Sequence, residues 1–88
     1  MGTIPKVTSA TLIGSADPPY IEVVANHSMS FRIEEVDDGE FWLYRGRNLK
    51  ATYQGKEGLG KGVVSKFPEY LNTDENFYYQ EQLKERVL

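Results

Sequence analysis

The amino-acid sequence predicts a small, mainly β fold that ends in an α-helix. Short runs of β-branched and aromatic residues, bounded by turn residues, fill most of the chain, and the apolar period changes near residue 73. The 88 residues are expected to form a single domain, because a chain of this length buries one modest core. We expect residues 7–67 to be β-rich, with about five strands in a small antiparallel β-barrel or a strongly bent sheet.

The first two predicted strands lie on either side of a rigid connector. Residues 7–13 mix β-branched and small side chains, and residues 20–25 form a short apolar run rich in branched side chains. The connector between them contains Asp17-Pro18-Pro19, and proline fixes the backbone angle φ. Both runs are therefore predicted to be strands.

A β-hairpin gives the strongest local signal. Residues 29–36 and 40–45 flank a three-residue loop, in which Gly39 would adopt the left-handed conformation that glycine tolerates without a Cβ penalty. This register pairs Val36 with Glu40 and puts the apolar residues on one face. That face holds Phe31, Ile33, Phe41 and Leu43. The opposite face holds Arg32, Glu34, Trp42 and Tyr44. We therefore expect Trp42 and Tyr44 to be partly exposed.

The C-terminal segment has a helical period. Tyr79, Leu83 and Val87 are spaced by four residues, which predicts one stripe of a helix over about residues 73–87. Asn72 or Thr73 can accept hydrogen bonds from the amides of its first turn. A helix this short is marginal alone, so we expect it to dock on the sheet.

Charge is sorted along the chain, although the total is only −3. Residues 17–41 carry seven acids and one base, whereas residues 43–67 carry six bases and one acid. Local potentials of this kind steer a charged partner even when the net charge is small. The six bases are Arg45, Arg47, Lys50, Lys56, Lys61 and Lys66.

The sequence contains no complete catalytic or metal-binding motif. Residues 55–61 match the glycine and lysine spacing of a phosphate-binding loop, but Gly62 stands where that motif needs a hydroxyl group for magnesium. His27 is the only histidine and there is no cysteine, so a metal site or a nucleophilic pair lacks its second member. We expect a non-enzymatic protein with no catalytic residue, no metal and no cofactor.

Membrane and secretion signals are not found in the sequence. No apolar run has the roughly 18 residues that a membrane span needs. The first residues lack the apolar stretch of a signal peptide. We therefore expect a soluble, cytoplasmic protein that does not bind a membrane.

The middle of the chain resembles an SH3 domain. The resemblance rests on residues 28–31, 35–43 and 55–59, within a region that covers about half of the chain. In that family a strand, an acidic turn and an aromatic pair precede a glycine-bearing strand that ends in a short helical turn. The resemblance implies a five-stranded barrel, with Trp42 or Phe41 where the family places its ligand-stacking tryptophan. The family's alanine-leucine-tyrosine-aspartate-tyrosine run has no counterpart near Tyr20, so the resemblance implies an architecture and no particular ligand.

Two classes of partner fit these patterns. The first is a protein or peptide that docks on the aromatic hairpin, with acidic residues at the rim that select a basic partner. The second is a nucleic acid bound by the basic and aromatic segment 42–67. The excess of acids over bases favours the protein partner, and a homodimer through an uncovered sheet edge is a third alternative. The candidate binding residues are Arg32, Glu34, Trp42, Tyr44, Arg45, Arg47 and Tyr53.

Overall fold

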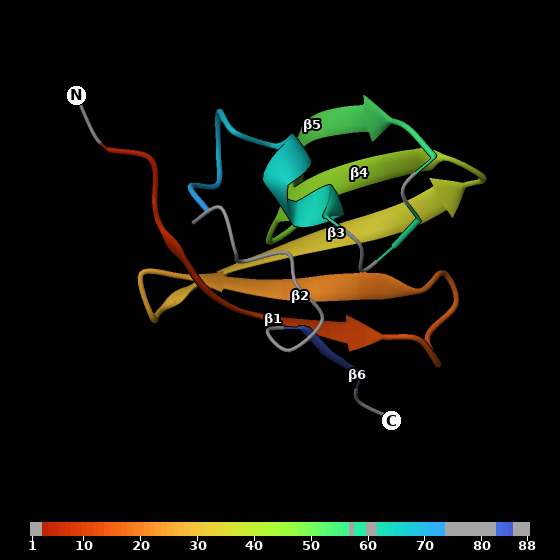
Figure 1. Ribbon diagram of the computed structural model, residues 1–88, viewed down its shortest axis with the longest axis horizontal. Coiled ribbons are helices and arrows are strands. Elements are labelled where there is room, and N and C mark those ends of the chain that lie inside the picture. Colours follow the sequence, from red (N-terminus) through yellow and green to blue (C-terminus); the bar gives the residue numbers. More distant parts are fainter. Residues whose placement is uncertain (1–2, 57, 60–61, 74–82, 86–88) are drawn as a thin grey trace.

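The protein folds around one six-stranded β-sheet with the strand order β5-β4-β3-β2-β1-β6 (Figure 1). The computed structural model describes residues 3–56, 58–59, 62–73 and 83–85. The strands are β1 (Val7–Ile13), β2 (Tyr20–Ala25), β3 (Met29–Asp37), β4 (Glu40–Arg45), β5 (Asn48–Gln54) and β6 (Leu83–Glu85). Neighbours among β1 to β5 are antiparallel, whereas β6 is parallel to β1. The predicted mainly β class with five antiparallel strands is confirmed.

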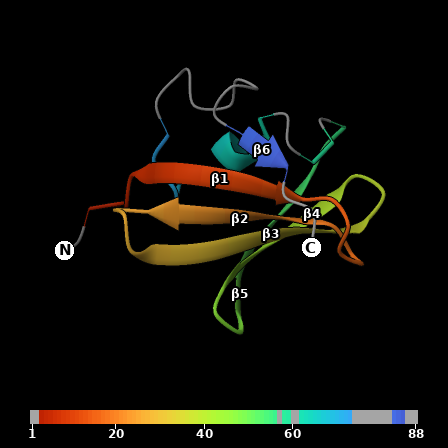
Figure 2. The ribbon, with the colours of Figure 1, turned by 90° about the horizontal axis from the view of Figure 1, so that it is seen from below.

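Of the two predicted arrangements, a closed barrel or a strongly bent sheet, the closed barrel is wrong for the part of the chain that the structure describes. Closure would require β5 to pair with β1, but β6 occupies the outer edge of β1 and β5 lies at the far end of the strand order. The sheet is instead open and strongly twisted, as Figure 2 shows for β4 and β5 relative to β1 and β2.

The predicted C-terminal helix is wrong at Leu83–Glu85, which form strand β6. Ala10 of β1 lies opposite Leu83, and Leu12 lies opposite Glu85. The outer edge of β1 offers backbone hydrogen bonds that a short helix, marginal by itself, has to outcompete. Residues 74–82 and 86–88 of the predicted helix lie outside the described residues.

The β3–β4 hairpin has the predicted register over most of its length. Ile33 pairs with Leu43, and Glu34 pairs with Trp42. At the turn the prediction is wrong by one residue, because Asp37 instead of Val36 lies opposite Glu40 and the register shifts between Glu35 and Asp37. Between Glu35 and Asp37, β3 therefore has one residue more than the paired part of β4. The predicted left-handed conformation of Gly39 is confirmed by its φ of 78°.

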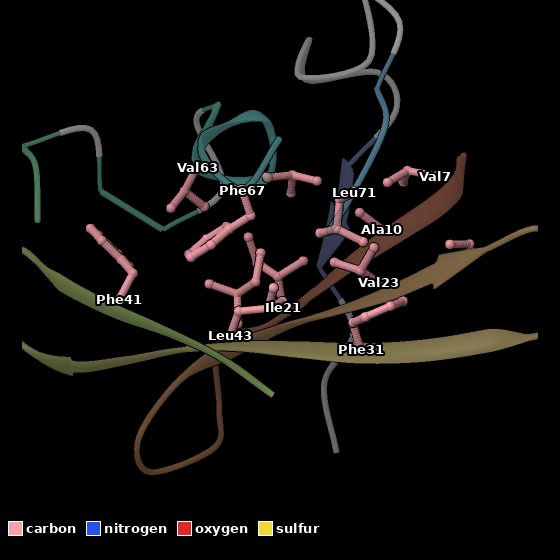
Figure 3. Close-up of a cluster of buried hydrophobic side chains, with 13 residues drawn as sticks. Val7, Ala10, Ile21, Val23, Phe31, Phe41, Leu43, Val63, Phe67 and Leu71 are labelled. Carbon is pink, nitrogen blue, oxygen red and sulfur yellow. The ribbon is translucent and has the colours of Figure 1, made fainter. Parts of the chain in front are cut away.

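The core lies between one face of the sheet, called the inner face, and a covering segment of residues 62–73 (Figure 3). The covering segment contains the 3-10 helix η1 (Val63–Lys66) and the turn that follows it. Backbone bonds tie it to the N-terminal segment, since the Asn72 amide donates to the Pro5 carbonyl and the Val7 amide donates to the Asn72 carbonyl. The largest fully buried core side chains are Ile21, Val23, Ile33, Phe41, Leu43, Val63 and Leu71.

Candidate functional site

The outer face of the sheet, opposite the covering segment, carries aromatic and charged side chains. Strand alternation puts them there, because Ile21, Ile33 and Leu43 point into the core. Cross-strand pairing aligns Tyr20, Glu34 and Trp42 in one row across β2, β3 and β4. A second row consists of Glu22, Arg32 and Tyr44. We call Tyr20, Arg32, Trp42 and Tyr44 the aromatic platform.

Arg32 lies at the centre of the aromatic platform. Its guanidinium carbon is 5.5 Å from the ring centroid of Tyr20 and 5.5 Å from that of Tyr44. Its Nε atom lies 2.8 Å from Glu34 Oε2, with the Arg32 side chain 45% exposed and the Glu34 side chain 16% exposed. An arginine over an aromatic ring gains about 0.5–1 kcal/mol at an exposed site. These contacts hold the guanidinium in one place while leaving much of it accessible.

Trp42 is fixed beside Arg32 by its indole group. Its Nε1–H group donates a hydrogen bond to Glu40 Oε2 at 2.8 Å. Its ring lies 6.4 Å from the Tyr44 ring between centroids, at an angle of 52°. Both aromatic residues are half-buried, so their predicted partial exposure is confirmed. The indole therefore presents an oriented apolar edge with its own polar group already satisfied.

A hollow of about 210 Å³ adjoins the aromatic platform. Tyr20, Glu22 and Arg32 line one part of it, and Gly46 of the β4–β5 turn lines another. This volume is smaller than the roughly 300–1,000 Å³ of a typical small-molecule site. The hollow therefore suits a single side chain of a larger partner.

Acidic side chains surround the aromatic platform. Glu22 and Glu34 lie in the two rows described above, and Glu40 bonds to the Trp42 indole. Among the described side chains of the two rows and Glu40, three carboxylates accompany the one guanidinium of Arg32. A surface of this kind is complementary to a partner that carries lysine or arginine.

The structure separates the other candidate residues from the aromatic platform. Tyr53 lies on the inner face, with its ring centroid 6.3 Å from those of both Phe41 and Phe67. The Arg45 guanidinium lies over the ring of Phe31, which belongs to the core, and Arg47 is exposed in the β4–β5 turn. Of the predicted residues, Arg32, Glu34, Trp42 and Tyr44 therefore form one surface.

Sequence reasoning missed Tyr20 and Glu40 as members of this surface. Tyr20 precedes the inward-facing Ile21, so strict alternation along β2 already places it on the outer face. What local alternation does not show is that β2 pairs with β3 and brings Tyr20 opposite Glu34. Alternation along β4 also places Glu40 on the same face as Trp42, two residues later, but it does not show the hydrogen bond between them.

Comparisons with known proteins found no matching family model, no match among curated proteins and no match among solved structures. Within the described ranges, no group of three or more histidine, aspartate or glutamate side chains is arranged to hold a metal ion. In the same ranges, no helix has the length and apolar character needed to cross a lipid bilayer. The function is therefore inferred from the geometry of the outer face.

Proposed function

We propose that the protein is a small non-enzymatic binding module that docks a protein partner on its aromatic platform. The observation that carries this proposal is the Arg32 guanidinium held between the rings of Tyr20 and Tyr44, 5.5 Å from each. Tryptophan, tyrosine and arginine are the residues that most often dominate the free energy of binding at protein interfaces. Side chains ordered before binding lose little conformational entropy when the partner arrives.

The proposed partner presents a basic side chain next to an apolar one. The carboxylates of Glu22, Glu34 and Glu40 favour a lysine or arginine at the rim of the contact. The hollow of about 210 Å³ beside Arg32 accommodates one side chain of the partner. Trp42 and Tyr44 supply the apolar area that is removed from water.

A nucleic-acid partner fits this arrangement less well. Binding a single strand requires cations along the backbone path beside the stacking rings. Here Arg45 and Lys50 line a different cleft, and acidic groups surround Trp42 and Tyr44. Phosphates at the aromatic platform would therefore meet repulsion from Glu34 and Glu40.

Affinity capture from native lysate, with and without nuclease, tests the proposal. The bait proteins are the wild type, Trp42→Ala and the control Arg47→Gln, which removes an exposed charge in the β4–β5 turn. We expect wild type and Arg47→Gln to retain a stoichiometric protein partner after nuclease treatment, and Trp42→Ala to lose it. Arg32→Gln, whose side chain is 45% exposed, should lose the partner as well. This second variant keeps the test valid if Trp42→Ala fails to fold.

Two results would contradict the proposal. One is equal recovery of the partner by wild type, Trp42→Ala and Arg32→Gln. The other is recovery of nucleic acid, with all captured proteins released by nuclease. Circular dichroism of each bait protein establishes that it is folded.

A further inference from the structure

A second cleft, of about 350 Å³, lies where the N-terminal segment passes the covering segment and the ends of β3, β4 and β5. In Figure 1 this is the side on which β3 begins, near the N-terminus. Its apolar lining includes Ile4, Phe31 and Tyr70, and its charged lining consists of Arg45, Lys50 and Glu69. Phe31 also borders the hollow beside the aromatic platform, but the two sites share no other lining residue.

The apolar lining is partly open to water. Ile4 is 42% exposed, one of two large hydrophobic residues in the described part of the chain that are so exposed. Tyr70 is half-buried, and Phe31 belongs to the hydrophobic core. A ligand that covers Ile4 would gain free energy because it removes apolar surface from water. The cleft therefore offers an apolar ligand a favourable free energy of transfer.

Two cations converge on the same cleft. The Arg45 guanidinium carbon lies 5.3 Å from the ring centroid of Phe31, which keeps the charge next to the apolar lining. Lys50 lies where the β4–β5 register shifts, since Leu43 pairs with Ala51 and Tyr44 pairs with Leu49. A β-bulge leaves one residue unpaired and re-aims its side chain. This irregularity gives Lys50 a place in the cleft beside Arg45.

The charges in the cleft are available to a ligand. Within the described residues, the side chains of Arg45, Lys50 and Glu69 form no ion pair or hydrogen bond. With two cations against one carboxylate, the cleft has a net positive charge. An anionic group is therefore attracted to Arg45 and Lys50 and repelled by Glu69.

We propose that this cleft binds a small amphipathic carboxylate. The hydrocarbon part lies against Ile4, Phe31 and Tyr70, and the carboxylate lies between Arg45 and Lys50. The volume is near the lower end of the roughly 300–1,000 Å³ found for small-molecule sites, which suits a short chain. Such a group comes either from a free organic acid or from the C-terminal residue of a peptide.

Amide NMR spectra of the labelled protein test the proposal with hexanoate as the probe. We expect saturable shifts at Ile4, Phe31, Lys50 and Tyr70, with weaker binding of hexanol and hexylamine, which lack the negative charge. A second probe is an acetylated tetrapeptide that ends in leucine, compared as the free acid and as the amide. Tighter binding of the free-acid peptide than of hexanoate assigns the site to a peptide C-terminus, and the reverse order assigns it to a free acid.

Charge variants decide whether the carboxylate lies where we place it. Arg45→Gln and Lys50→Gln should each weaken hexanoate binding about two- to five-fold, the effect of losing one exposed ion pair. Glu69→Gln should tighten binding, whereas Arg47→Gln and Trp42→Ala should leave it unchanged. Trp42→Ala also separates this site from the proposed docking of a protein partner.

Three results would overturn the proposal. The first is the absence of saturable shifts at the cleft residues. The second is hexanol binding as tightly as hexanoate. The third is a hexanoate affinity that changes in none of the variants Arg45→Gln, Lys50→Gln and Glu69→Gln. If Arg45→Gln or Lys50→Gln fails to fold, the effect of Glu69→Gln on hexanoate affinity still decides the test.

Discussion

At the scale of single residues, Gly39 and Gly46 share a backbone conformation but differ in their surroundings. Their φ angles are 78° and 62°, both in the left-handed region that disfavours other residues. A Cβ atom on Gly39 would lie 2.9 Å from the carbonyl oxygen of Gly55, whereas nothing lies within 4 Å of such an atom on Gly46. The two positions therefore separate the cost of the backbone angle from the cost of a steric clash.

Gly39→Ala should destabilise the fold more than Gly46→Ala. Both substitutions carry the cost of a left-handed alanine, roughly 1–2 kcal/mol. Gly39→Ala additionally displaces the backbone of Gly55, whose amide donates to the Gly39 carbonyl at 2.9 Å. We expect an extra loss of about 1–3 kcal/mol in the free energy of unfolding, measured by urea denaturation. Equal losses for the two variants would show that Gly55 shifts aside at no cost.

Phe41 and Trp42 are neighbours in sequence on opposite faces of β4. Phe41 is fully buried in the core, and Trp42 is half-buried on the outer face. Phe41→Ala should lower the free energy of unfolding by about 3–5 kcal/mol, because it leaves a cavity under the covering segment. We expect Trp42→Ala to cost less than half as much in the same urea experiment. A Trp42→Ala loss as large as that of Phe41→Ala would place the indole in the core.

At the scale of elements, the β3–β4 hairpin was predictable because its information is local. The alternation of apolar and polar residues indicated which side chains share a face of the hairpin, and Gly39 indicated the position of the turn. The barrel, and the helix at Leu83–Glu85, were wrong because strand order depends on contacts between distant segments. Leu83–Glu85 pair with β1, more than seventy residues away in sequence. No local sequence pattern indicates that these residues pair with the edge of β1.

The covering segment should depend on Phe67 for its attachment to the sheet. Phe67 is 3% exposed, and its ring lies 6.3 Å from that of Tyr53, measured between centroids. Phe67→Ala should cost about 3–5 kcal/mol in the free energy of unfolding. It should also speed hydrogen exchange of the Leu71 amide, which donates to the Phe67 carbonyl at 2.8 Å.

Glu69→Gln is the matched control for Phe67→Ala in the same segment. Glu69 is exposed, so its substitution should change the free energy of unfolding by less than about 0.5 kcal/mol. Unchanged exchange at Leu71 in Phe67→Ala would mean that the segment is held by Val63, Val64 and Leu71 without Phe67.

At the scale of the whole molecule, the charge sorting seen in the sequence becomes a separation in space. Glu22, Glu34 and Glu40 from the acidic part surround the aromatic platform. Arg45 and Lys50 from the basic part line the second cleft. The sequence predicted Arg32, Glu34, Trp42 and Tyr44 through alternation. It missed Tyr20 and the second cleft, because both depend on how distant segments come together.

Binding of the captured partner should depend only weakly on salt. An interface centred on Trp42 and Tyr44 gains most of its free energy from burial, which added salt does not screen. Raising the salt concentration from about 50 to about 200 mM should weaken the partner's affinity less than tenfold, whereas six to ten phosphate contacts would weaken it about 10³–10⁵-fold. Isothermal titration at several salt concentrations measures the slope. A loss in the larger range would indicate a nucleic acid or a similar polyanion.

NMR mapping of the partner-bound, labelled protein tests the aromatic platform most directly. We expect the Trp42 indole signal and the amides of Tyr20, Arg32 and Tyr44 to shift or broaden. Val63 and Leu71, buried in the covering segment, should change little. Changes confined to Arg45, Lys50 and Lys66, with an unaltered Trp42 indole signal, would contradict the proposed docking on the aromatic platform and move the binding surface to the basic residues.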